Sequence, residues 1–315
     1  MIFLKVISKL STALKIFSLV LVLSCSQDEG GFLTETPFEN IIVISSSNTT
    51  HRGITAYDLD GNLIKVITDF RADGGTPRST VHLGDGNFLT VQDNPDKATK
   101  YDFKTATKSN FIGTNFFSGT IMDSVVDSRG NIYVAETHAI EKFNSSGNRE
   151  PLQTGNAFIQ GTIGVCALNN ARGLFMTEDD ILIVASFTSG DIVIYDVSTE
   201  TPQCLSSVSV GAEVNGVMLH SNGSLYFTRF NTDEIYRAAP DGSGAILIWP
   251  GDITKINNPA DLVELPDGTI LVAGLSNHQI WRIDEDGAEV GTNPFIVDAQ
   301  TSTIRDIEII LSEDN

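Results

Sequence analysis

The chain is poor in cysteine, in tryptophan and in basic residues. Its 315 residues include three cysteines, two tryptophans and 20 lysines and arginines against 40 aspartates and glutamates, for a formal net charge of −20. Such a surface repels phosphate backbones and anionic lipid headgroups, which argues against nucleic acid as a partner. Besides Cys25, only Cys166 and Cys204 are present, too few for a disulfide-stapled fold. These two can form one disulfide in an oxidising compartment or remain as buried free thiols.

Several catalytic and cofactor motifs are also absent. The chain contains no Gly-x-Ser-x-Gly nucleophile motif, no phosphate-binding Gly-Lys-Ser/Thr loop and no Cys-x-x-Cys pair. No pair of histidines or cysteines has the spacing of zinc ligands. After residue 24 no segment keeps an apolar period of 3.6 residues, so we expect little helix.

The first 24 residues have the features of a removable export signal. Lys5, Lys9 and Lys15 provide positive charge, and residues 16–23 form an apolar run too short to span a bilayer. The run ends in the sequence VLSC, which resembles the lipobox of bacterial lipoproteins. The resemblance implies that residues 1–24 are removed and that Cys25 is lipidated, which anchors the protein to a membrane. The alternative is an ordinary secretory signal followed by an unrelated cysteine.

Residues 25–38 form a polar segment ahead of the first β-rich sequence. After Cys25 the chain reads SQDEGG, which is acidic and glycine-containing and cannot bury apolar surface. We therefore expect a flexible tether. An acidic cluster directly after the lipidated cysteine also resembles the surface-export signal of Bacteroidetes lipoproteins. This implies the outer membrane or the cell surface rather than the inner membrane.

A repeat with a period near 44 residues runs through residues 39–315. Each copy has an apolar stretch, a tight polar turn, a short β-branched run, a polar loop and a second strand. The turn position recurs at intervals of 44, 50, 43 and 45 residues, at Gly86, Gly130, Asp180, Gly223 and Gly268. Such a period with several short strands per copy is typical of β-propeller blades. We therefore expect a single all-β domain over residues 39–315.

The two ends of this domain predict the number of blades. Residues 41–45, 53–58 and 63–68 read as three strands of a first blade that lacks its innermost strand. Residues 304–311 read as an innermost strand with no further strand after it. If the last strand completes the first blade, the ring closes and leaves no open sheet edge. The sequence therefore predicts a six-bladed β-propeller of four-stranded blades, closed by its C-terminal strand.

Two strings connect the repeat to known propeller families. The sequence VAGLSNHQIWRID, with Asn277, His278 and Gln279 at its centre, resembles an NHL repeat. The sequences EVNGV, SNGSLYFTR and EIYR between residues 213 and 237 resemble the gluconolactonase and regucalcin type of six-bladed propeller. The resemblance covers roughly residues 40–315 and rests on turn and strand residues, so it specifies fold better than function.

The repeat also aligns the residues that begin each innermost strand, at the mouth of the central channel. One column holds Arg78, Met122, Arg172, Asn215, Ala260 and Arg305, and the next holds Ser79, Asp123, Gly173, Gly216, Asp261 and Asp306. The arginines and aspartates can bind the carboxylates and hydroxyls of a ligand, or they can simply pair with one another. Because side chains alternate along a strand, we expect one of the two columns to face a neighbouring blade.

Loops between the second and third strands should share this face of the ring. They place ten further residues there, namely Gln92, Asp93, Glu136, His138, Phe187, Arg229, Phe230, Asn231, Asn277 and His278. The candidates for a role in binding among them are the aromatic residues Phe187 and Phe230 and the histidines His138 and His278. The aromatic rings can stack on carbohydrate or peptide, or pack between loops. The histidines can assist acid–base chemistry, or serve as ordinary hydrogen-bonding residues.

The gluconolactonase resemblance implies a divalent cation, held by a carboxylate, two asparagines and an aspartate. Asn215 matches one asparagine position and Asp261 approximates the aspartate, whereas Arg78 and Ser79 stand where the early carboxylate would be. Calcium or a similar cation is thus expected only if the protein is an enzyme of this type. Arg78, Arg172 and Arg305 would repel it.

Three functions remain on sequence grounds. The leading hypothesis is a non-catalytic, lipid-anchored propeller that needs no cofactor and binds a protein, peptide or glycan at the channel mouth. The alternative is a metal-dependent lactonase or related hydrolase with Asn215 and Asp261 as metal ligands. A second alternative is a structural scaffold that holds an envelope assembly together through its rim.

Overall fold

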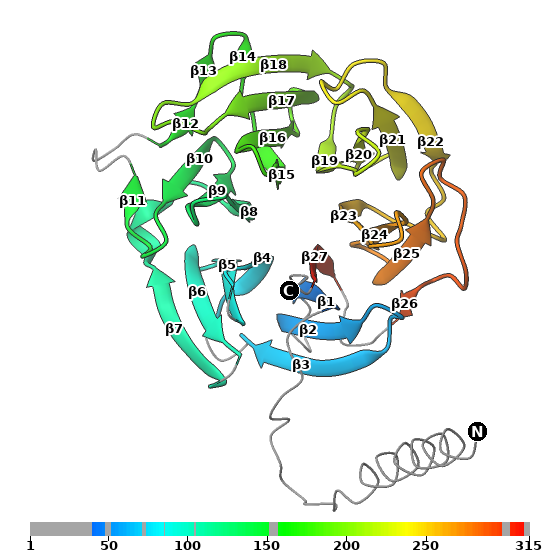
Figure 1. Cartoon of the computed structure of the whole chain (residues 1–315), viewed down its shortest axis with the longest axis horizontal. Coiled ribbons are helices and arrows are strands. Elements are labelled where there is room, and N and C mark those ends of the chain that lie inside the picture. The colour runs from blue at the N-terminus through cyan, green and yellow to red at the C-terminus, as the bar shows by residue number, and fades with distance from the viewer. Residues whose placement is uncertain are drawn as a thin grey trace, which may run out of the picture. The chain divides into compact units, whose positions relative to one another are not determined.

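Among the described residues, six sheets are arranged as blades around a central axis, and a seventh sheet is a small two-stranded hairpin (Figure 1). The computed structural model describes residues 40–47, 52–70, 74–84, 86–103, 105–150, 157–297 and 303–311. The expected signal peptide at 1–24, the tether at 25–38 and the lipidation site Cys25 lie outside the described residues. No helix in the described ranges is long and apolar enough to cross a membrane.

Each blade is an antiparallel sheet. Its strands run from the channel outward in chain order, except that the innermost strand of the first blade is the C-terminal one. The first three blades comprise β27 (Ile304–Ile310), β1 (Ile41–Ser47), β2 (Arg52–Asp58) and β3 (Leu63–Asp69); β4 (Thr76–His82), β5 (Asn87–Asp93), β6 (Lys97–Asp102) and β7 (Thr107–Ile112); and β8 (Ile121–Val126), β9 (Ile132–Glu136), β10 (Ala139–Phe143) and β11 (Arg149–Glu150), with β12 (Ile159–Gln160) also paired to β10. A short 3-10 turn, Thr114–Phe116, separates the second and third blades.

The other three blades repeat this order. They comprise β15 (Ala171–Met176), β16 (Ile181–Ser186), β17 (Asp191–Asp196) and β18 (Gln203–Ser209); β19 (Val214–Leu219), β20 (Leu225–Arg229), β21 (Glu234–Ala238) and β22 (Ile246–Pro250); and β23 (Pro259–Glu264), β24 (Ile270–Gly274), β25 (Gln279–Ile283) and β26 (Ile296–Val297). The predicted fold, a six-bladed all-β propeller, is confirmed.

The ring closes where the two ends of the domain meet. Strand β27 pairs antiparallel with β1, with Ile307 opposite Ile44 and Ile309 opposite Ile42. It is the innermost strand of the first blade, as Figure 1 shows in red beside blue. The predicted closure by the C-terminal strand is therefore confirmed.

The recurring turn residues connect the first and second strands of their blades with a left-handed backbone. Gly130, Asp180, Gly223 and Gly268 have φ values of 78°, 59°, 82° and 79°. Glycine adopts this region without steric cost, and aspartate tolerates it better than most residues. The regular spacing of the repeat in the sequence thus follows from a backbone requirement of each blade.

The core consists of six apolar clusters, one between each pair of neighbouring blades. Since both faces of a blade pack against a neighbour, the second and third strands are buried on both sides; all five residues of β9, β10 and β24 are buried. The outermost strands β3, β7 and β22 are largely exposed. Burying each Leu, Ile or Phe side chain contributes roughly 1.5–3 kcal/mol, so the blade interfaces hold the ring together.

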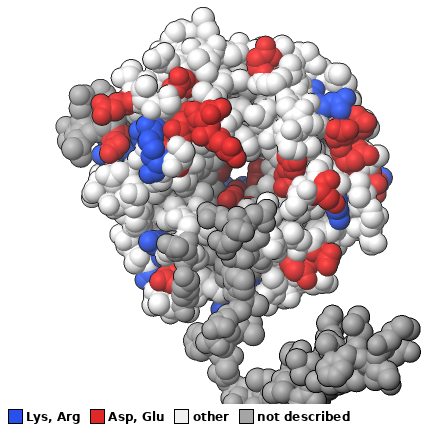
Figure 2. Space-filling view, in the orientation of Figure 1, with Lys and Arg blue, Asp and Glu red and all other residues white. Residues whose placement is uncertain are grey.

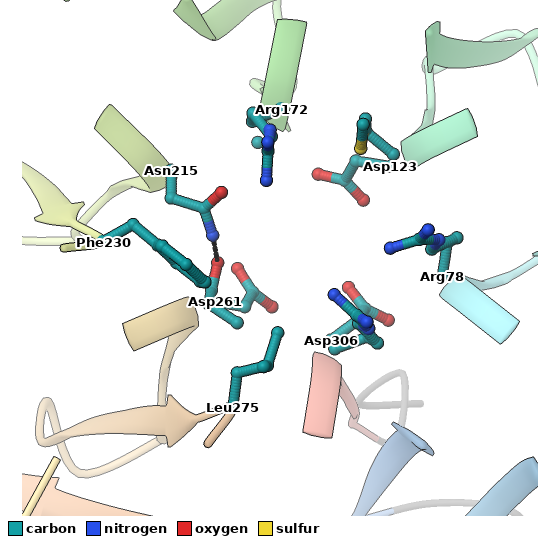
Figure 3. A pocket seen from close by; sticks show the side chains of 12 residues that line it. Arg78, Asp123, Arg172, Asn215, Phe230, Asp261, Leu275 and Asp306 are labelled. Atoms are coloured by element: carbon teal, nitrogen blue, oxygen red, sulfur yellow. Dashed lines mark hydrogen bonds between the residues drawn. The ribbon is translucent and has the colours of Figure 1, made fainter. Parts of the chain in front are cut away.

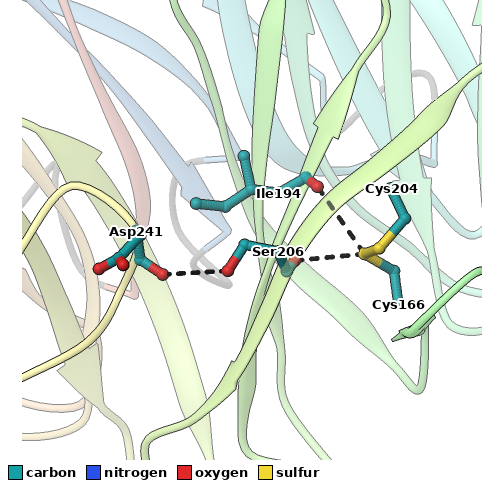
Figure 4. The surroundings of a disulfide bond; sticks show 5 residues. All are labelled: Cys166, Ile194, Cys204, Ser206 and Asp241. Atoms are coloured by element: carbon teal, nitrogen blue, oxygen red, sulfur yellow. Dashed lines mark hydrogen bonds between the residues drawn. A yellow bond between two sulfur atoms is a disulfide. The ribbon is translucent and has the colours of Figure 1, made fainter.

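A disulfide joins Cys166 and Cys204. The sequence alone allowed either this bond or two free thiols. Cys166 lies on a small hairpin of β13 (Thr162–Ile163) and β14 (Cys166–Ala167), and Cys204 lies on β18, the outer strand of the fourth blade. The Sγ atom of Cys166 packs 3.2 Å from the carbonyl oxygen of Ser206 (Figure 4). The bond therefore attaches the hairpin to the rim of the ring.

Candidate functional site

Every innermost strand carries a β-bulge at the channel mouth. In each blade the register between the innermost strand and its neighbour slips at the same point, namely at Ser45/Ser46 opposite β27, Pro77/Ser79, Ile121/Asp123, Ala171/Leu174, Val214/Val217 and Pro259/Asp261. A bulge adds one residue to a strand and re-aims the side chains around it.

The bulges bring residues of both sequence columns to one pocket. Its lining includes the arginines Arg78, Arg172 and Arg305 of the first column and the aspartates Asp123, Asp261 and Asp306 of the second. The expected contact of one column with a neighbouring blade is found for the second column, and its aspartates line the pocket as well. Figure 3 shows the labelled members of both sets converging on the channel axis. We call this site the arginine pocket; its volume is about 40 Å³.

The three arginines of the pocket have different partners. Arg78 forms an ion pair with Asp93, at the end of β5. The Nε of Arg305 donates a hydrogen bond to the Oγ of Ser47 at 3.0 Å. The guanidinium carbon of Arg172 lies 4.0 Å from the centre of the Phe187 ring, a cation–π contact.

Two of these guanidinium groups have no counter-ion within the described part of the chain. Neither Arg172 nor Arg305 has a carboxylate oxygen within 4.0 Å there. Burial lowers the pKa of Arg305 to about 10, and the nearby charges of Arg78 and Arg172 also lower it. Burial, and then Arg78, lower the pKa of Arg172. Among the described residues none of these arginines pairs with an aspartate of the second column, and the carboxylate partner of Arg78 is Asp93 of its own blade.

The second column makes the contacts between neighbouring blades. Asp123 accepts a hydrogen bond from the backbone N–H of Leu174 at 2.7 Å, Asp261 accepts one from Ile307 at 3.0 Å, and Asp306 accepts one from Thr80 at 2.8 Å. In each case the donor belongs to the next blade around the ring. The aspartates therefore join blades as well as lining the pocket, and they are occupied by backbone donors rather than by the arginines.

Glycines of the same column allow the fourth, fifth and sixth blades to approach closely. A Cβ on Gly173 would lie 2.2 Å from the carbonyl oxygen of Asn215, and one on Gly216 would lie 2.9 Å from the Cα of Asp261. Asn215 uses its Nδ2 to donate a hydrogen bond to the carbonyl oxygen of Ala260 at 2.6 Å. On this side of the channel, close backbone contacts join the blades. The second column is uncharged at Gly173 and Gly216, and its next charged residue is Asp261.

The buried carboxyl groups retain their protons to unusually high pH. Burial raises the pKa of Asp123 to about 6. Burial and the charge of Asp123 raise the pKa of Asp261 to about 7, and burial with the charges of Asp261 and Asp123 raises that of Asp306. Burial, followed by the charge of Asp261, raises the pKa of Glu308 to about 8. Near neutral pH this layer therefore carries less negative charge than its four carboxyl groups suggest.

The same three aspartates also border a larger cavity of about 430 Å³. Its walls include the apolar residues Val125, Met176, Val217 and Val263. The blades run in opposite order in Figures 1 and 3, so these figures view the ring from opposite sides. Figure 2 has the orientation of Figure 1 and therefore shows the face opposite to that of Figure 3. On this face acidic side chains lie around and inside the central hollow.

The loop candidates divide between the pocket and its surroundings. Phe230 lines the arginine pocket, and Phe187 packs against it with ring centres 6.3 Å apart and planes at 67°. His138 is exposed in the turn after β9, and His278 accepts a hydrogen bond at Nδ1 from the backbone of Thr303 at 2.7 Å. Neither histidine lines the arginine pocket.

Sequence reasoning did not select Leu275, which lines the pocket, and it placed Asp93 on this face without proposing that it pairs with Arg78. Both lie where a second strand of a blade ends, at β24 and β5. Leu275 has no chemical signal in the sequence, because an apolar loop residue resembles ordinary packing.

The residues proposed as metal ligands lie together but among cations. Asn215 and Asp261 both line the arginine pocket, where three guanidinium groups oppose a divalent cation. Among the described residues, no three or more histidine, cysteine, aspartate or glutamate side chains are arranged to hold a metal ion. The donor set therefore fits a cation poorly.

Comparison with known proteins gives the fold and no family. No protein-family model matches the chain, and no curated protein matches it. Among solved structures, the chain is similar to a chain of a nidogen/laminin complex, with a TM-score of 0.68 and 12% identity over 87% of this chain and 99% of that one. A protein of unknown function from Bacteroides caccae gives 0.58 and 14% over 86% and 98%.

Two enzyme structures also share the architecture. Virginiamycin B lyase from Staphylococcus aureus, in a catalytically inactive variant with quinupristin, has a TM-score of 0.56 and 12% identity over 88% of this chain and 87% of that one. A streptogramin B lyase has a TM-score of 0.52 and 14% identity over 76% and 84%. At these identities the likeness extends to the propeller fold alone.

Proposed function

We propose that this protein is a lipid-anchored envelope propeller that binds a protein, peptide or glycan partner at the arginine pocket, without catalysis. The carrying observation is the convergence of Arg78, Arg172 and Arg305 on one mouth, where only Arg78 has a carboxylate partner among the described residues. Burying a charge without a partner is costly, and a partner group of opposite charge would offset that cost. Phe230, at the edge of the same pocket, adds an apolar surface for contact.

The two lyases with the same fold support this proposal because they differ from the present chain. The inactive lyase carries a histidine-to-alanine substitution, which ties catalysis in that protein to a histidine. In the present chain no histidine of the described ranges lines the arginine pocket. The three guanidinium groups also oppose the metal-assisted chemistry of a lactonase.

The binding proposal is tested by substituting Arg172 and Arg305 with glutamine in one variant. The wild-type chain, the variant and an Arg237→Gln control are compared on a glycan array and in crosslinking pull-downs from cell envelopes. Arg237, on strand β21 and away from the pocket lining, pairs with Asp286, so its variant should retain every partner. Partner capture that is equal in the double variant and in the wild type contradicts binding at this mouth.

The lactonase alternative rests on the shared location of Asn215 and Asp261 in the pocket. Lactone hydrolysis is measured with added calcium, manganese or zinc, and again with a chelator. Turnover that requires the metal and is lost in Asp261→Asn would favour the enzyme. Turnover equal to the background in all conditions would eliminate it.

The anchor is tested separately through Cys25. The Cys25→Ala chain should leave the membrane fraction and should not incorporate a labelled fatty acid, because it lacks the thiol that carries the acyl chain. Protease treatment of intact cells then distinguishes the cell surface from the inner leaflet of the outer membrane. Membrane association that persists in Cys25→Ala would argue against lipidation as the tether.

A further inference from the structure

We propose that the group recognised in the arginine pocket is a carboxylate carried on a small apolar body, held between Arg172 and Arg305. This inference rests on the proposed function and names the chemistry of the ligand. Arg78 contributes charge but is already committed to Asp93, so the two other guanidinium groups make the new contacts.

The first step is the state of Arg172. Its guanidinium stacks on the Phe187 ring, and its Nε is buried and has no hydrogen-bond partner. Stacking fixes the plane of the guanidinium and leaves its N–H donors in that plane unused. The Nε of Arg78, across the pocket, is likewise buried without a partner. Buried donors without acceptors are destabilising, and a ligand oxygen satisfies them.

The second step is the charge of the ligand. The charge of Arg78 lowers the pKa of both Arg172 and Arg305, and the charge of Arg172 also lowers that of Arg305, because these guanidinium groups line one pocket and repel one another. An anion between them removes that repulsion and can take a planar, two-oxygen arrangement that matches a guanidinium fork. The ligand group is therefore an oxyanion rather than a hydroxyl or an amine.

The third step is size, because the pocket volume is about 40 Å³. By this measure one water takes about 10–15 Å³, so the pocket holds roughly three waters. A carboxylate fits this space, whereas a sugar ring does not. The rest of the ligand must then lie at the mouth, where Met122, Phe230 and Leu275 line the pocket with apolar surface.

The fourth step separates a carboxylate from phosphate or sulfate. Asp123, Asp261 and Asp306 line the same pocket beside the arginines. Their oxygens are engaged with backbone N–H groups, so they do not turn away when a ligand enters. Asp123, whose pKa of about 6 leaves it ionised at neutral pH, would repel a second negative charge on the ligand, which favours a monoanion.

The experiment uses calorimetry on the full chain in detergent with butyrate, its neutral analogue butanamide, and inorganic phosphate. Butyrate should bind saturably, whereas butanamide and phosphate should bind at least tenfold more weakly. Arg172→Gln and Arg305→Gln should each lower butyrate affinity at least tenfold, and Arg237→Gln should not change it. Arg172→Lys, which keeps the charge but not the fork, should give an intermediate loss.

Folding is checked in the same samples. Because Arg172 has no counter-ion among the described residues, Arg172→Gln should unfold at the same or a higher temperature than the wild type. Equal binding of butyrate and butanamide, or tighter binding of phosphate, overturns the proposal. Unchanged butyrate affinity in folded Arg172→Gln does so as well.

A further arm separates a free acid from a peptide terminus, using an apolar tripeptide with a free or an amidated C-terminus. Binding of the free form alone, more tightly than butyrate, assigns a peptide; binding of butyrate alone assigns a small acid. The outcome also separates this inference from the proposed function. Arginine-dependent capture of a partner without butyrate binding refutes only the carboxylate. Arginine-dependent butyrate binding with arginine-independent capture refutes only the docking face.

Discussion

Replacing Asp261 with asparagine tests the carboxyl layer beneath the arginines. Asp261 is half-buried between blades and accepts a hydrogen bond from the backbone N–H of Ile307, which an asparagine oxygen can also accept. Burial and Asp123 raise its pKa from 3.8 to about 7. The folded state therefore holds this proton more tightly than the unfolded chain does. The contribution of this carboxyl group to stability must therefore fall as the pH rises from about 4 to about 7, and then remain level.

The size of the effect follows from that shift. Three pKa units correspond to roughly 4 kcal/mol at most, and structural relaxation around the carboxylate reduces this, so we expect about 2–4 kcal/mol. The asparagine side chain carries no proton to lose, so Asp261→Asn should be more stable than the wild type by this amount at pH 8, and nearly equal to it at pH 4. For a domain of this size the gain at pH 8 is a rise in Tm of roughly 5–10 °C.

Urea and thermal unfolding at pH 4, 6 and 8 measure this difference. The matched control is Asp179→Asn, which changes an exposed carboxylate in the turn between β15 and β16 and should leave the pH dependence unaltered. If Asp261→Asn is less stable than the wild type at pH 8, or keeps the wild-type pH dependence, then the carboxylate is stabilised by its surroundings and the reasoning fails.

Three further predictions concern the ring itself. Gly173→Ala should lower the Tm, because the new Cβ would lie 2.2 Å from the carbonyl oxygen of Asn215. The control Gly113→Ala has open space around it and should leave the Tm unchanged. Equal Tm values for the two variants would contradict the close contact of the fourth and fifth blades. Removing the disulfide with Cys166→Ser and Cys204→Ser should lower the free energy of unfolding, measured in urea, by about 4 kcal/mol, because the bond closes a loop of roughly 38 residues and so reduces the entropy of the unfolded chain. An unchanged urea midpoint in the double variant would show that the bond adds no stability. A chain that ends at residue 303 lacks β27 and should lose cooperative unfolding, which circular dichroism checks against the full chain.

The sequence predicted the fold well because each blade repeats a backbone requirement. A positive φ between the first two strands needs glycine or a tolerant residue, and this is visible as a regular spacing. The closing strand was also visible, since β27 is an apolar strand at the end of the chain and β1 begins a blade without an innermost strand. These are local signals with a fixed period, which a single sequence displays.

The site was harder to predict because it depends on departures from regular geometry. Alternation along a strand places adjacent residues on opposite sides, and the sequence offers no sign of the slip at Pro77/Ser79 or at Ile121/Asp123. The partners of the arginines were equally hidden, since Arg78 pairs across its own blade with Asp93 and Arg172 stacks on Phe187. The disulfide required the hairpin β13–β14 to fold over β18, a contact between segments 38 residues apart.

The bulges explain how arginines and aspartates of one ring can lie side by side without forming ion pairs with one another. At three of the bulges the second residue is an aspartate that accepts a backbone N–H of the next blade, as Asp306 does from Thr80, while arginines of the first column also line the pocket. The aspartates are thereby satisfied by the scaffold, and Arg172 and Arg305 lose the partners that adjacent charges would normally provide. A regular ladder would have placed the two columns on opposite sides of the strand. The irregularity shared by all six blades is thus what leaves uncompensated positive charge at the mouth of a protein with a net charge of −20.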